Sequence, residues 1–327
     1  MTTRESVLAA LRAAGGDGVS GEALARALGV SRVAIGKHVA ALREAGYDIA
    51  AEPGVGYALI GVPDGPLPAE IAPLLGDAAW MQLTGGGETQ STNDDARVLA
   101  REGAAGGTVV LASRQTRGRG RLGRDWASPE GGAYLSLVLR PSVTPADVTP
   151  LALVVGLGIA RGLQECLGVE VSLKWPNDVQ LPSGKLAGVL LEMAAETDRV
   201  NWVVVGVGLN IRRAADFPGA PRAACLDDIV PGIRIATAVA AVLDGIASAY
   251  AQWVAIGFSS MRAEYEARSS LLGRDVTVRD MAGTVKSSGT VMGVDDDGRL
   301  LLATLAGLEM VVAGEVTLRE PGSSPFA

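Results

Sequence analysis

The spacing of apolar residues divides the chain into regions of different periodicity. Over residues 1–60 apolar side chains recur every three or four positions, which predicts short amphipathic helices. Over residues 80–270 apolar runs of strand length alternate with longer helical runs, and this alternation predicts a mixed α/β domain. Short alternating runs over residues 271–327, around the turn signal DDDG at 295–298, predict a small β-barrel. The proline-rich segment 61–79 is expected to be a linker.

The first region carries the signals of three helices followed by a hairpin. Ser20 and Ser31 are suited to cap the second and third helices, and Gly29 supplies the turn between them. The third helix has an apolar stripe on one face and no acidic residue from 31 to 43. Two helices joined by a tight turn, then a hairpin with PGVG at its tip, predict a winged helix-turn-helix. The expected bounds are 4–14, 21–28 and 31–45 for the helices and 48–59 for the hairpin.

The outward face of the third helix is the candidate DNA-binding surface. Arg32, Val33, Gly36 and Lys37 lie on it at helical spacing, away from the apolar stripe. A small packing or dimerisation module is the alternative interpretation. Residues 1–60 hold six basic and six acidic side chains, so we expect weak non-specific attraction to phosphate. Useful affinity would then need two copies of the chain on a palindromic site.

Composition and charge exclude several classes of protein. The net charge of −7 excludes a chain that is basic throughout and coats nucleic acid. Two cysteines and a single histidine provide neither a disulfide framework nor the ligands of a typical zinc site. The N-terminus lacks the pattern of a signal peptide, and no uncharged apolar segment approaches about 20 residues. We therefore expect a soluble cytoplasmic protein with no membrane partner.

The densest chemical signal is the segment RGRGRLGRDW at residues 117–126. From Ser113 to Asp125 the chain carries five arginines and one acid, a net charge of +4. Alternating Gly and Arg allow a loop to wrap an anion and place guanidinium groups on a phosphate or carboxylate. The segment also matches the dinucleotide fingerprint GxGxxG, but no helix follows it and no acid stands about 20 residues later, so we reject that interpretation. An RNA-binding or solvated basic loop is the remaining alternative.

Three further motifs bear polar groups at the ends of predicted elements. KWPND at 174–178 and GKLAG at 184–188 place Lys174 and Lys185 on opposite arms of one expected hairpin-like turn, where both could enter one pocket. STN at 91–93 begins a helix, where it can cap the helix and also hold a small polar group. The glycines of GVGLN at 206–210 would let a flat ligand lie against the backbone.

Five motifs in this order and spacing resemble those of biotin protein ligases: QSTN at 90–93, GRGRLGRDWASP at 118–129, KWPND at 174–178, GKLAGVLLE at 184–192 and GVGLN at 206–210. With its first and last regions, the whole chain resembles the family of bifunctional biotin ligases and biotin operon repressors. The fold this implies is an α/β multidomain protein. It would have an N-terminal winged helix-turn-helix, a central ligase domain similar to class II synthetases, and a C-terminal SH3-like β-barrel.

The resemblance implies an ATP-dependent reaction in two steps. The biotin carboxylate attacks the α-phosphate of ATP, with Mg²⁺, and gives biotinyl-5′-AMP and pyrophosphate. A lysine of the biotin carboxyl carrier domain of acetyl-CoA carboxylase then takes the biotin. The implied partners are this carrier domain, an operator DNA, and a second copy of the chain once the adenylate is bound.

The resemblance also implies the residues of the site. The biotin ureido ring would be read by Ser91, Thr92, Asn93, Gln115 and the backbone at Arg119, Gly120 and Arg121. The groups that close over phosphate and carboxylate would be Arg119, Arg121, Arg124 and Lys185. Lys174 and Asn177 would serve the nucleotide and its Mg²⁺, with no resident metal held by the protein. The pocket lining would include Trp126, Gly188, Gly206, Val207, Gly208 and Asn210. The catalytic residues would be Lys185, Arg121 and Asp178, of which Asp178 orients or deprotonates the acceptor amine.

Three other functions stay open at this point. A lipoate protein ligase shares the fold and chemistry, but its pattern lacks the segment at residues 117–126, called the Arg-Gly loop below, and the KWPND pairing. The chain could instead be a transcription factor that senses biotin without ligase activity, although an intact Lys185 and Arg-Gly loop argue against this. It could also be a ligase whose helix-turn-helix has lost DNA binding, since Val55 stands in the wing where a basic residue is common.

Overall fold

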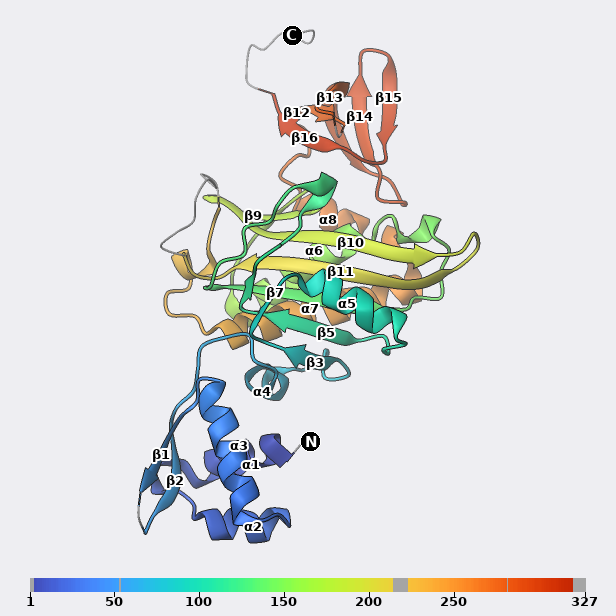
Figure 1. Ribbon diagram of the computed structural model, residues 1–327. Coiled ribbons are helices and arrows are strands. Elements are labelled where there is room, and N and C mark those ends of the chain that lie inside the picture. The colour runs from blue at the N-terminus through green and yellow to red at the C-terminus, as the bar shows by residue number, and fades with distance from the viewer. Residues whose placement is uncertain (1–2, 53, 214–222, 281, 320–327) are drawn as a thin grey trace. The chain divides into compact units, whose positions relative to one another are not determined.

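The computed structural model describes residues 3–52, 54–213, 223–280 and 282–319. The chain divides between Asp64 and Gly65 into two compact units (Figure 1). Pro53 of the expected wing tip and residues 320–327 of the expected β-barrel lie outside the described residues.

The first unit contains the predicted helices and hairpin. The Oγ atoms of Ser20 and Ser31 accept hydrogen bonds from the N–H groups of Ala23 and Ala34, at 3.0 and 3.1 Å, which confirms both caps. Its elements are α1 (Thr3–Ala14), η1 (Gly15–Asp17), α2 (Gly21–Leu28), α3 (Arg32–Glu44), β1 (Asp48–Glu52) and β2 (Gly56–Gly61). The three α-helices meet at a core that includes Val7, Leu8, Leu11, Leu24, Ile35, Val39 and Leu42.

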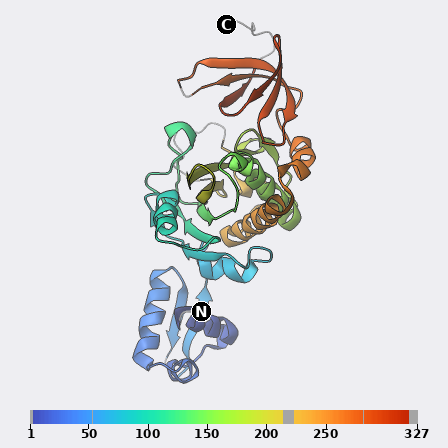
Figure 2. The same cartoon turned by 90° about the vertical axis from the view of Figure 1, so that its right-hand side faces the viewer.

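A seven-stranded sheet forms the centre of the second unit, in the order β3-β5-β7-β11-β10-β9-β8. Neighbouring strands are antiparallel except for the parallel pair β3–β5. The strands are β3 (Gln82–Gly85), β5 (Thr108–Ala112), β7 (Gly132–Leu139), β8 (Ser172–Lys174), β9 (Asp178–Leu181), β10 (Gly184–Ala195) and β11 (Val200–Asn210). One face of the sheet carries α6 (Leu151–Leu167) and α7 (Ile235–Ile256), and the other carries α5 (Thr92–Arg101) (Figures 1 and 2). The mixed α/β prediction is confirmed.

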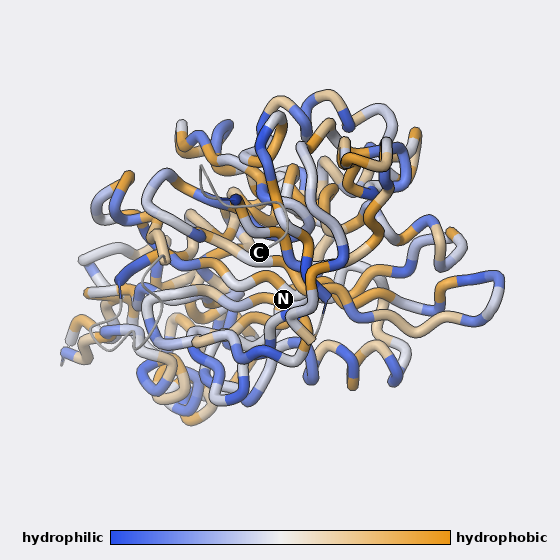
Figure 3. Tube along the Cα trace, turned by 90° about the horizontal axis from the view of Figure 1, so that it is seen from above, coloured by the Kyte–Doolittle hydropathy of each residue, from blue (hydrophilic) through white to orange (hydrophobic). Residues whose placement is uncertain are grey.

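Helices α6 and α7 pack against each other at glycines. A β-carbon on Gly162 of α6 would lie 1.9 Å from the carbonyl oxygen of Ala241 on α7, so only glycine permits this approach. By length and composition alone, segments 146–167 and 235–256 could cross a membrane. Their most apolar windows are 72% and 56% buried inside the protein, as expected for core helices. Coloured by hydropathy, the trace in Figure 3 is hydrophobic along many strands and helices and hydrophilic at many loops.

The expected linker is shorter than the sequence suggested. Residues from Gly65 onward belong to the second unit, in which Ile71 and Ala78 are fully buried in the main core. The carboxylate of Asp244 on α7 accepts hydrogen bonds from the N–H groups of Gly76 and Ala78, at 2.9 and 2.8 Å. Two prolines of this segment, Pro68 and Pro73, lie in the first turn of short helices, α4 (Pro68–Ile71) and η2 (Ala72–Leu74).

A five-stranded antiparallel sheet ends the described chain, in the order β15-β14-β13-β12-β16. Its strands are β12 (Asp275–Arg279), β13 (Val285–Val294), β14 (Leu300–Thr304), β15 (Gly307–Val311) and β16 (Glu315–Leu318). The indole Nε1 of Trp175 donates to the carbonyl of Gly298 at 2.9 Å, which attaches this small β domain to the end of β8. The remaining elements are β4 (Glu88–Thr89), β6 (Arg114–Gln115), η3 (Arg121–Gly123), η4 (Ala146–Val148), η5 (Leu226–Asp228), η6 (Phe258–Ser260) and α8 (Arg262–Ala267).

Candidate active site

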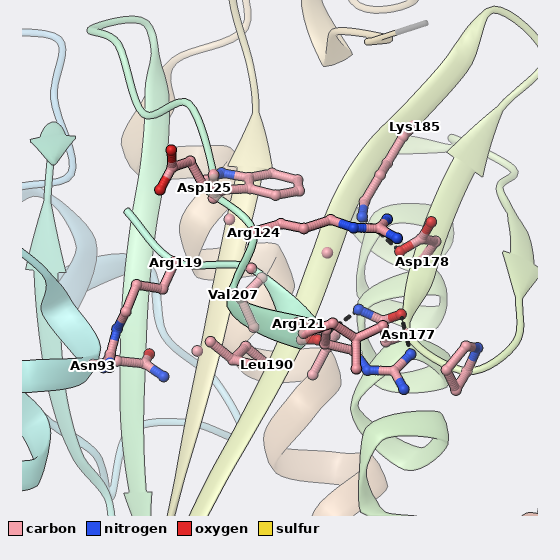
Figure 4. Close-up of a pocket in the computed structure, with 18 of the residues that line it drawn as sticks. Asn93, Arg119, Arg121, Arg124, Asp125, Asn177, Asp178, Lys185, Leu190 and Val207 are labelled. Carbon is pink, nitrogen blue, oxygen red and sulfur yellow. Dashed lines mark hydrogen bonds and ion pairs between the residues drawn. The ribbon is translucent and has the colours of Figure 1, made fainter. Parts of the chain in front are cut away.

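A cavity of about 300 Å³ lies where α5, the Arg-Gly loop and strands β8 to β11 meet (Figure 4). Of the residues that the sequence predicts for the ligase site, all except Asn210 line this cavity. Those residues are Ser91, Thr92, Asn93, Gln115, Arg119, Gly120, Arg121, Arg124, Trp126, Lys174, Asn177, Asp178, Lys185, Gly188, Gly206, Val207 and Gly208. The small β domain adds Gly314, Glu315 and Val316 to the lining.

One end of the cavity is polar and buried. Ser91 caps α5, and both the N–H and the hydroxyl of Thr92 donate to Oε1 of Gln115, at 2.8 and 3.1 Å. The amide nitrogen of Gln115 donates in turn to Oγ of Ser128 at 2.9 Å. Asn93, also buried, donates from Nδ2 to Oε2 of Glu192 at 2.7 Å. Because these side chains hold one another, their polar atoms are fixed before a ligand arrives.

Two glycines of β11 let the side chains of Asn93 and Trp126 lie against the sheet. A β-carbon on Gly206 would stand 2.2 Å from Oδ1 of Asn93, and one on Gly208 would stand 2.4 Å from Nε1 of Trp126. Both positions therefore require glycine for close approach. The sequence predicted that a flat ligand would lie against the GVGLN glycines, whereas the groups that approach Gly206 and Gly208 here are side chains of the protein.

The Arg-Gly loop crosses the cavity, and its arginines contact α5, β10, β16 and the turn before β9. Arg119 donates to Asp94 and Glu192 at 2.7 and 3.1 Å, and Arg121 donates to Oδ1 of Asn177 at 3.1 Å. Arg124 forms two hydrogen bonds with the carboxylate of Glu315, one of them 2.9 Å long. The side chains of Arg119, Arg121 and Arg124 all line the cavity, as Figure 4 shows.

These contacts shift the ionisation of the groups involved. Burial lowers the pKa of Arg121, while the hydrogen bonds to Glu315 raise the pKa of Arg124. The Glu315 carboxyl has a lowered pKa because it accepts from Arg124, and Lys174 and Arg121 add to the effect. The side of the cavity near the β domain therefore favours negative charge.

Lys185 stands at the centre of the charged side. Its Nζ lies 2.6 Å from Oδ1 of Asp178 and 4.8 Å from the ring centroid of Trp126. The pairing of β10 with β9 is irregular between Lys185 and Ala187. This irregularity frees the Lys185 carbonyl, which accepts from Nδ2 of Asn210 at 3.2 Å and from the N–H of Ala224 at 2.9 Å.

Two expectations about placement need correction. Asn210 is buried beside the backbone of Lys185 and is not among the described residues that line the cavity, because its amide satisfies that freed carbonyl. Lys174 and Lys185 do both line the cavity, but they are not on opposite arms of one turn. Strand β9 lies between them: Lys174 pairs with Asp178, and Lys185 pairs with Gln180. A four-residue strand was too short to be recognised in the sequence.

Three residues of the site were missed or given no role. Ser136 lies with Oγ 2.6 Å from Oδ1 of Asn93 and 2.8 Å from Oγ1 of Thr92, and its signal was a lone hydroxyl within the apolar strand β7. Glu192 ends the GKLAGVLLE motif. Glu315 had no local signal, because only the packing of the β domain brings it to the cavity.

The predicted DNA-binding residues lie on the outward side of α3. Val33 is 72% exposed, and Arg32 and Lys37 are exposed beside it. A β-carbon on Gly36 would meet nothing within 4 Å, so no packing requirement explains glycine there. In the wing, by contrast, a β-carbon on Gly56 would stand 2.3 Å from the carbonyl oxygen of Val19.

Comparison with known proteins agrees with this organisation. Residues 86–210 match the biotin/lipoate A/B protein ligase family, residues 3–58 an HTH domain, and residues 271–319 the biotin protein ligase C terminal domain. The bifunctional ligase/repressor BirA of Bacillus subtilis (strain 168) is 33% identical, over 97% of this chain and 99% of that protein. The chain belongs to the bifunctional ligase/repressor BirA family.

Other members of the BirA family and its structures support the same assignment. The bifunctional ligase/repressor BirA of Escherichia coli (strain K12) is 32% identical, over 94% of both chains. A solved structure of biotin protein ligase from Aquifex aeolicus, in complex with biotin and ATP, is 30% identical with a TM-score of 0.63. The match covers 73% of this chain and 99% of the Aquifex aeolicus chain.

Proposed function

We propose that this BirA-family protein is a biotin–[acetyl-CoA-carboxylase] ligase that also binds an operator DNA as a repressor. The observation that carries the ligase proposal is the division of one cavity into two ends. Asn93, Thr92 and Gln115 form a neutral hydrogen-bonding end, and Lys185 with Arg121 and Arg124 forms a cationic end. Biotin has the matching pair of groups, a neutral ureido ring and a carboxylate.

In the first step, one carboxylate oxygen of biotin attacks the α-phosphate of ATP. The new P–O bond forms as the bond to pyrophosphate breaks, which leaves biotinyl-5′-AMP. No enzyme nucleophile is needed, so the protein acts by holding two anions together and stabilising the charge on phosphate. Lys185 touches the reacting carboxylate and phosphate, and Arg121 and Arg124 contact the acyl phosphate. The indole of Trp126 forms the wall beside Lys185.

The oxygen donors near Lys185 suit Mg²⁺ that arrives with ATP. Asp178 and Glu315 offer carboxylates and Asn177 an amide oxygen, all on the cavity lining. Lys174 lies beside them and serves the nucleotide phosphates. When bound, Mg²⁺ would neutralise charge on the leaving pyrophosphate.

In the second step, the amine of an acceptor lysine attacks the acyl carbon of the adenylate. The bond to AMP breaks, an amide forms, and the amine loses a proton. Asp178 is the proposed acceptor of that proton, because its carboxylate is on the cavity wall and already hydrogen-bonds an ammonium group, that of Lys185. The acceptor is a biotin carboxyl carrier domain, and the reaction takes place in the cytoplasm.

The helix-turn-helix is proposed to bind DNA through Arg32, Val33, Gly36 and Lys37. Residues 1–60 carry six acidic and six basic side chains, so a single copy has little general attraction to DNA. We propose that the chain dimerises with the adenylate bound and places two recognition helices on a palindromic operator. Turnover and repression would then compete for the same intermediate.

The ligase proposal is tested by incubating the full-length protein with ATP, Mg²⁺, labelled biotin and a purified biotin carboxyl carrier domain. We expect label on the carrier, and no label when its acceptor lysine is replaced by arginine. Labelled lipoate in place of biotin should give none. A folded protein that labels no carrier would be a sensor rather than a ligase.

Gel shifts on the promoter of the organism's biotin biosynthesis genes test the repressor proposal. We expect a shift that becomes stronger when biotin and ATP are both added. A protein that labels the carrier but gives no shift at low salt and micromolar concentration would be a ligase only.

A further inference from the structure

One carboxylate joins the neutral end of the cavity to the Arg-Gly loop. Oε2 of Glu192 accepts from Nδ2 of Asn93 at 2.7 Å and from Nη2 of Arg119 at 3.1 Å. Its other oxygen accepts from Nη1 of Arg97 at 3.2 Å. The side chain is 23% exposed, so these bonds are partly shielded from water. Asn93 is fixed at the start of α5, whereas Arg119 lies on the Arg-Gly loop.

Glu192 determines which way the Asn93 amide faces. Ser136 lies 2.6 Å from Oδ1 of Asn93, and Glu192 receives its Nδ2 hydrogen. A carboxylate accepts hydrogen bonds and does not donate them, so Nδ2 must face it and Oδ1 must face the other way. Oδ1 then lies against Gly206, on the cavity lining, where it can accept from an N–H group of a ligand.

The same carboxylate also anchors the loop. Arg119 donates to Glu192 and Asp94, so its guanidinium group is held to β10 and to the first turn of α5. The next arginines along the loop contact Asn177 and Glu315 on the opposite side of the cavity. Glu192 is therefore the acceptor that the loop shares with the neutral end of the cavity.

We propose that Glu192 is a positioning residue that couples recognition of the biotin ureido group to closure of the Arg-Gly loop. It keeps the Asn93 amide in the orientation that accepts a ureido N–H, and it holds Arg119 beside that amide. A ligand that engages Asn93 thereby stabilises the attachment of the loop. This inference rests on the proposed ligase function and assigns Glu192 no contact with the reacting atoms.

Two substitutions separate the two parts of this role. Glu192→Ala removes the bonds to Asn93 and Arg119, together with the one to Arg97. The KM for biotin in pyrophosphate exchange should therefore rise about tenfold or more, while the KM for ATP changes by less than about threefold. Glu192→Gln keeps an oxygen for Asn93 but removes the charge that holds Arg119. Its KM for biotin should stay within about threefold of wild type.

Cleavage of the Arg-Gly loop by trypsin measures the other part of this role, the attachment of Arg119 to Glu192. Saturating biotin should slow cleavage at residues 117–124 of the wild type, and lipoate, which has a carboxylate but no ureido group, should not. Neither Glu192 variant should show the full protection by biotin. Glu196→Gln is the matched control, because Glu196 pairs with exposed Arg199 near the far end of the same strand. It should behave as wild type in both assays.

Three results would overturn the coupling. The first is a Glu192→Ala variant whose KM for biotin and whose loop protection by biotin equal those of wild type. The second is a wild-type loop that lipoate protects from trypsin as well as biotin does. The third is that Glu192→Ala and Glu192→Gln lose biotin affinity and melting temperature to the same extent. The last would mean a structural role only. A wild-type protein without biotin-dependent pyrophosphate exchange would overturn the ligase function itself, and the coupling with it.

Discussion

The cavity and the outward face of α3 are both candidate functional surfaces, but the fold constrains them differently. In the cavity each key cation has a protein partner: Lys185 has Asp178, Arg121 has Asn177 and Arg124 has Glu315. On α3, Val33 is 72% exposed and a β-carbon on Gly36 would touch nothing. Residues of the cavity are therefore constrained by contacts within the fold, whereas Val33 and Gly36 of the α3 face have no comparable constraint.

The largest effect is expected from Lys185→Ala. This substitution removes the ammonium group that stabilises the charge developing on phosphate, so the rate of adenylate formation should fall by a factor of about 10² or more. Single-turnover measurement of biotinyl-5′-AMP checks it. Lys286→Ala, at an exposed ion pair of the β domain, is the control and should keep the wild-type rate. A near-normal rate in Lys185→Ala would remove Lys185 from the mechanism.

Gly208→Ala tests the wall that the Trp126 indole forms beside Lys185. The new β-carbon would stand 2.4 Å from the Trp126 indole, which must move away from the strand. We expect the KM for ATP or biotin to rise about tenfold, because a displaced wall no longer holds the ligand in the reacting geometry. Gly87→Ala is the matched control, since its β-carbon would meet nothing within 4 Å. Equal kinetics for the two variants would contradict the role of Gly208.

Gly36→Ala should separate stability from function on α3. Alanine favours a helix over glycine, so the free energy of unfolding should rise by about 0.5–1 kcal/mol. The added methyl group should nevertheless weaken operator binding severalfold, because it holds the helix away from the groove. Thermal melts and gel shifts measure the two effects. A variant that is more stable and binds the operator as tightly as wild type would show that glycine at this position does not serve DNA.

The smallest effect is expected at the Arg124–Glu315 pair. The pKa of Glu315 is lowered in the folded protein, so its contribution to stability is present at neutral pH and is lost as the pH falls through that lowered value. The two side chains are 59% and 42% exposed, which limits the contribution to a few tenths of a kcal/mol, at most about 1 kcal/mol. The melting temperatures of wild type and Glu315→Gln should differ slightly at neutral pH and converge as the pH falls below that lowered pKa. A difference that grows on acidification would have the wrong sign.

The sequence predicted the fold and most of the cavity, because the relevant signals are local. Helix α6 begins and ends where its apolar run does, and the motif residues from Ser91 to Gly208 meet in one cavity. What the sequence could not show depends on contacts between distant segments. Glu315 reaches the cavity through the packing of a separate β domain. Asn210 was predicted in the cavity lining, but its amide bonds the Lys185 carbonyl instead. An irregular strand pairing frees that carbonyl, and the sequence gives no sign of this irregularity.

The proposed function depends on the role of Lys185 in activating biotin as an adenylate in this cavity. Its most direct test is thin-layer separation of the products after wild type and Lys185→Ala are each incubated with ATP, Mg²⁺ and labelled biotin. We expect labelled biotinyl-5′-AMP with an equal amount of pyrophosphate from wild type, and at least about a hundredfold slower formation from the variant. A folded wild-type protein that forms no adenylate, or a variant that forms it at the wild-type rate, would contradict it.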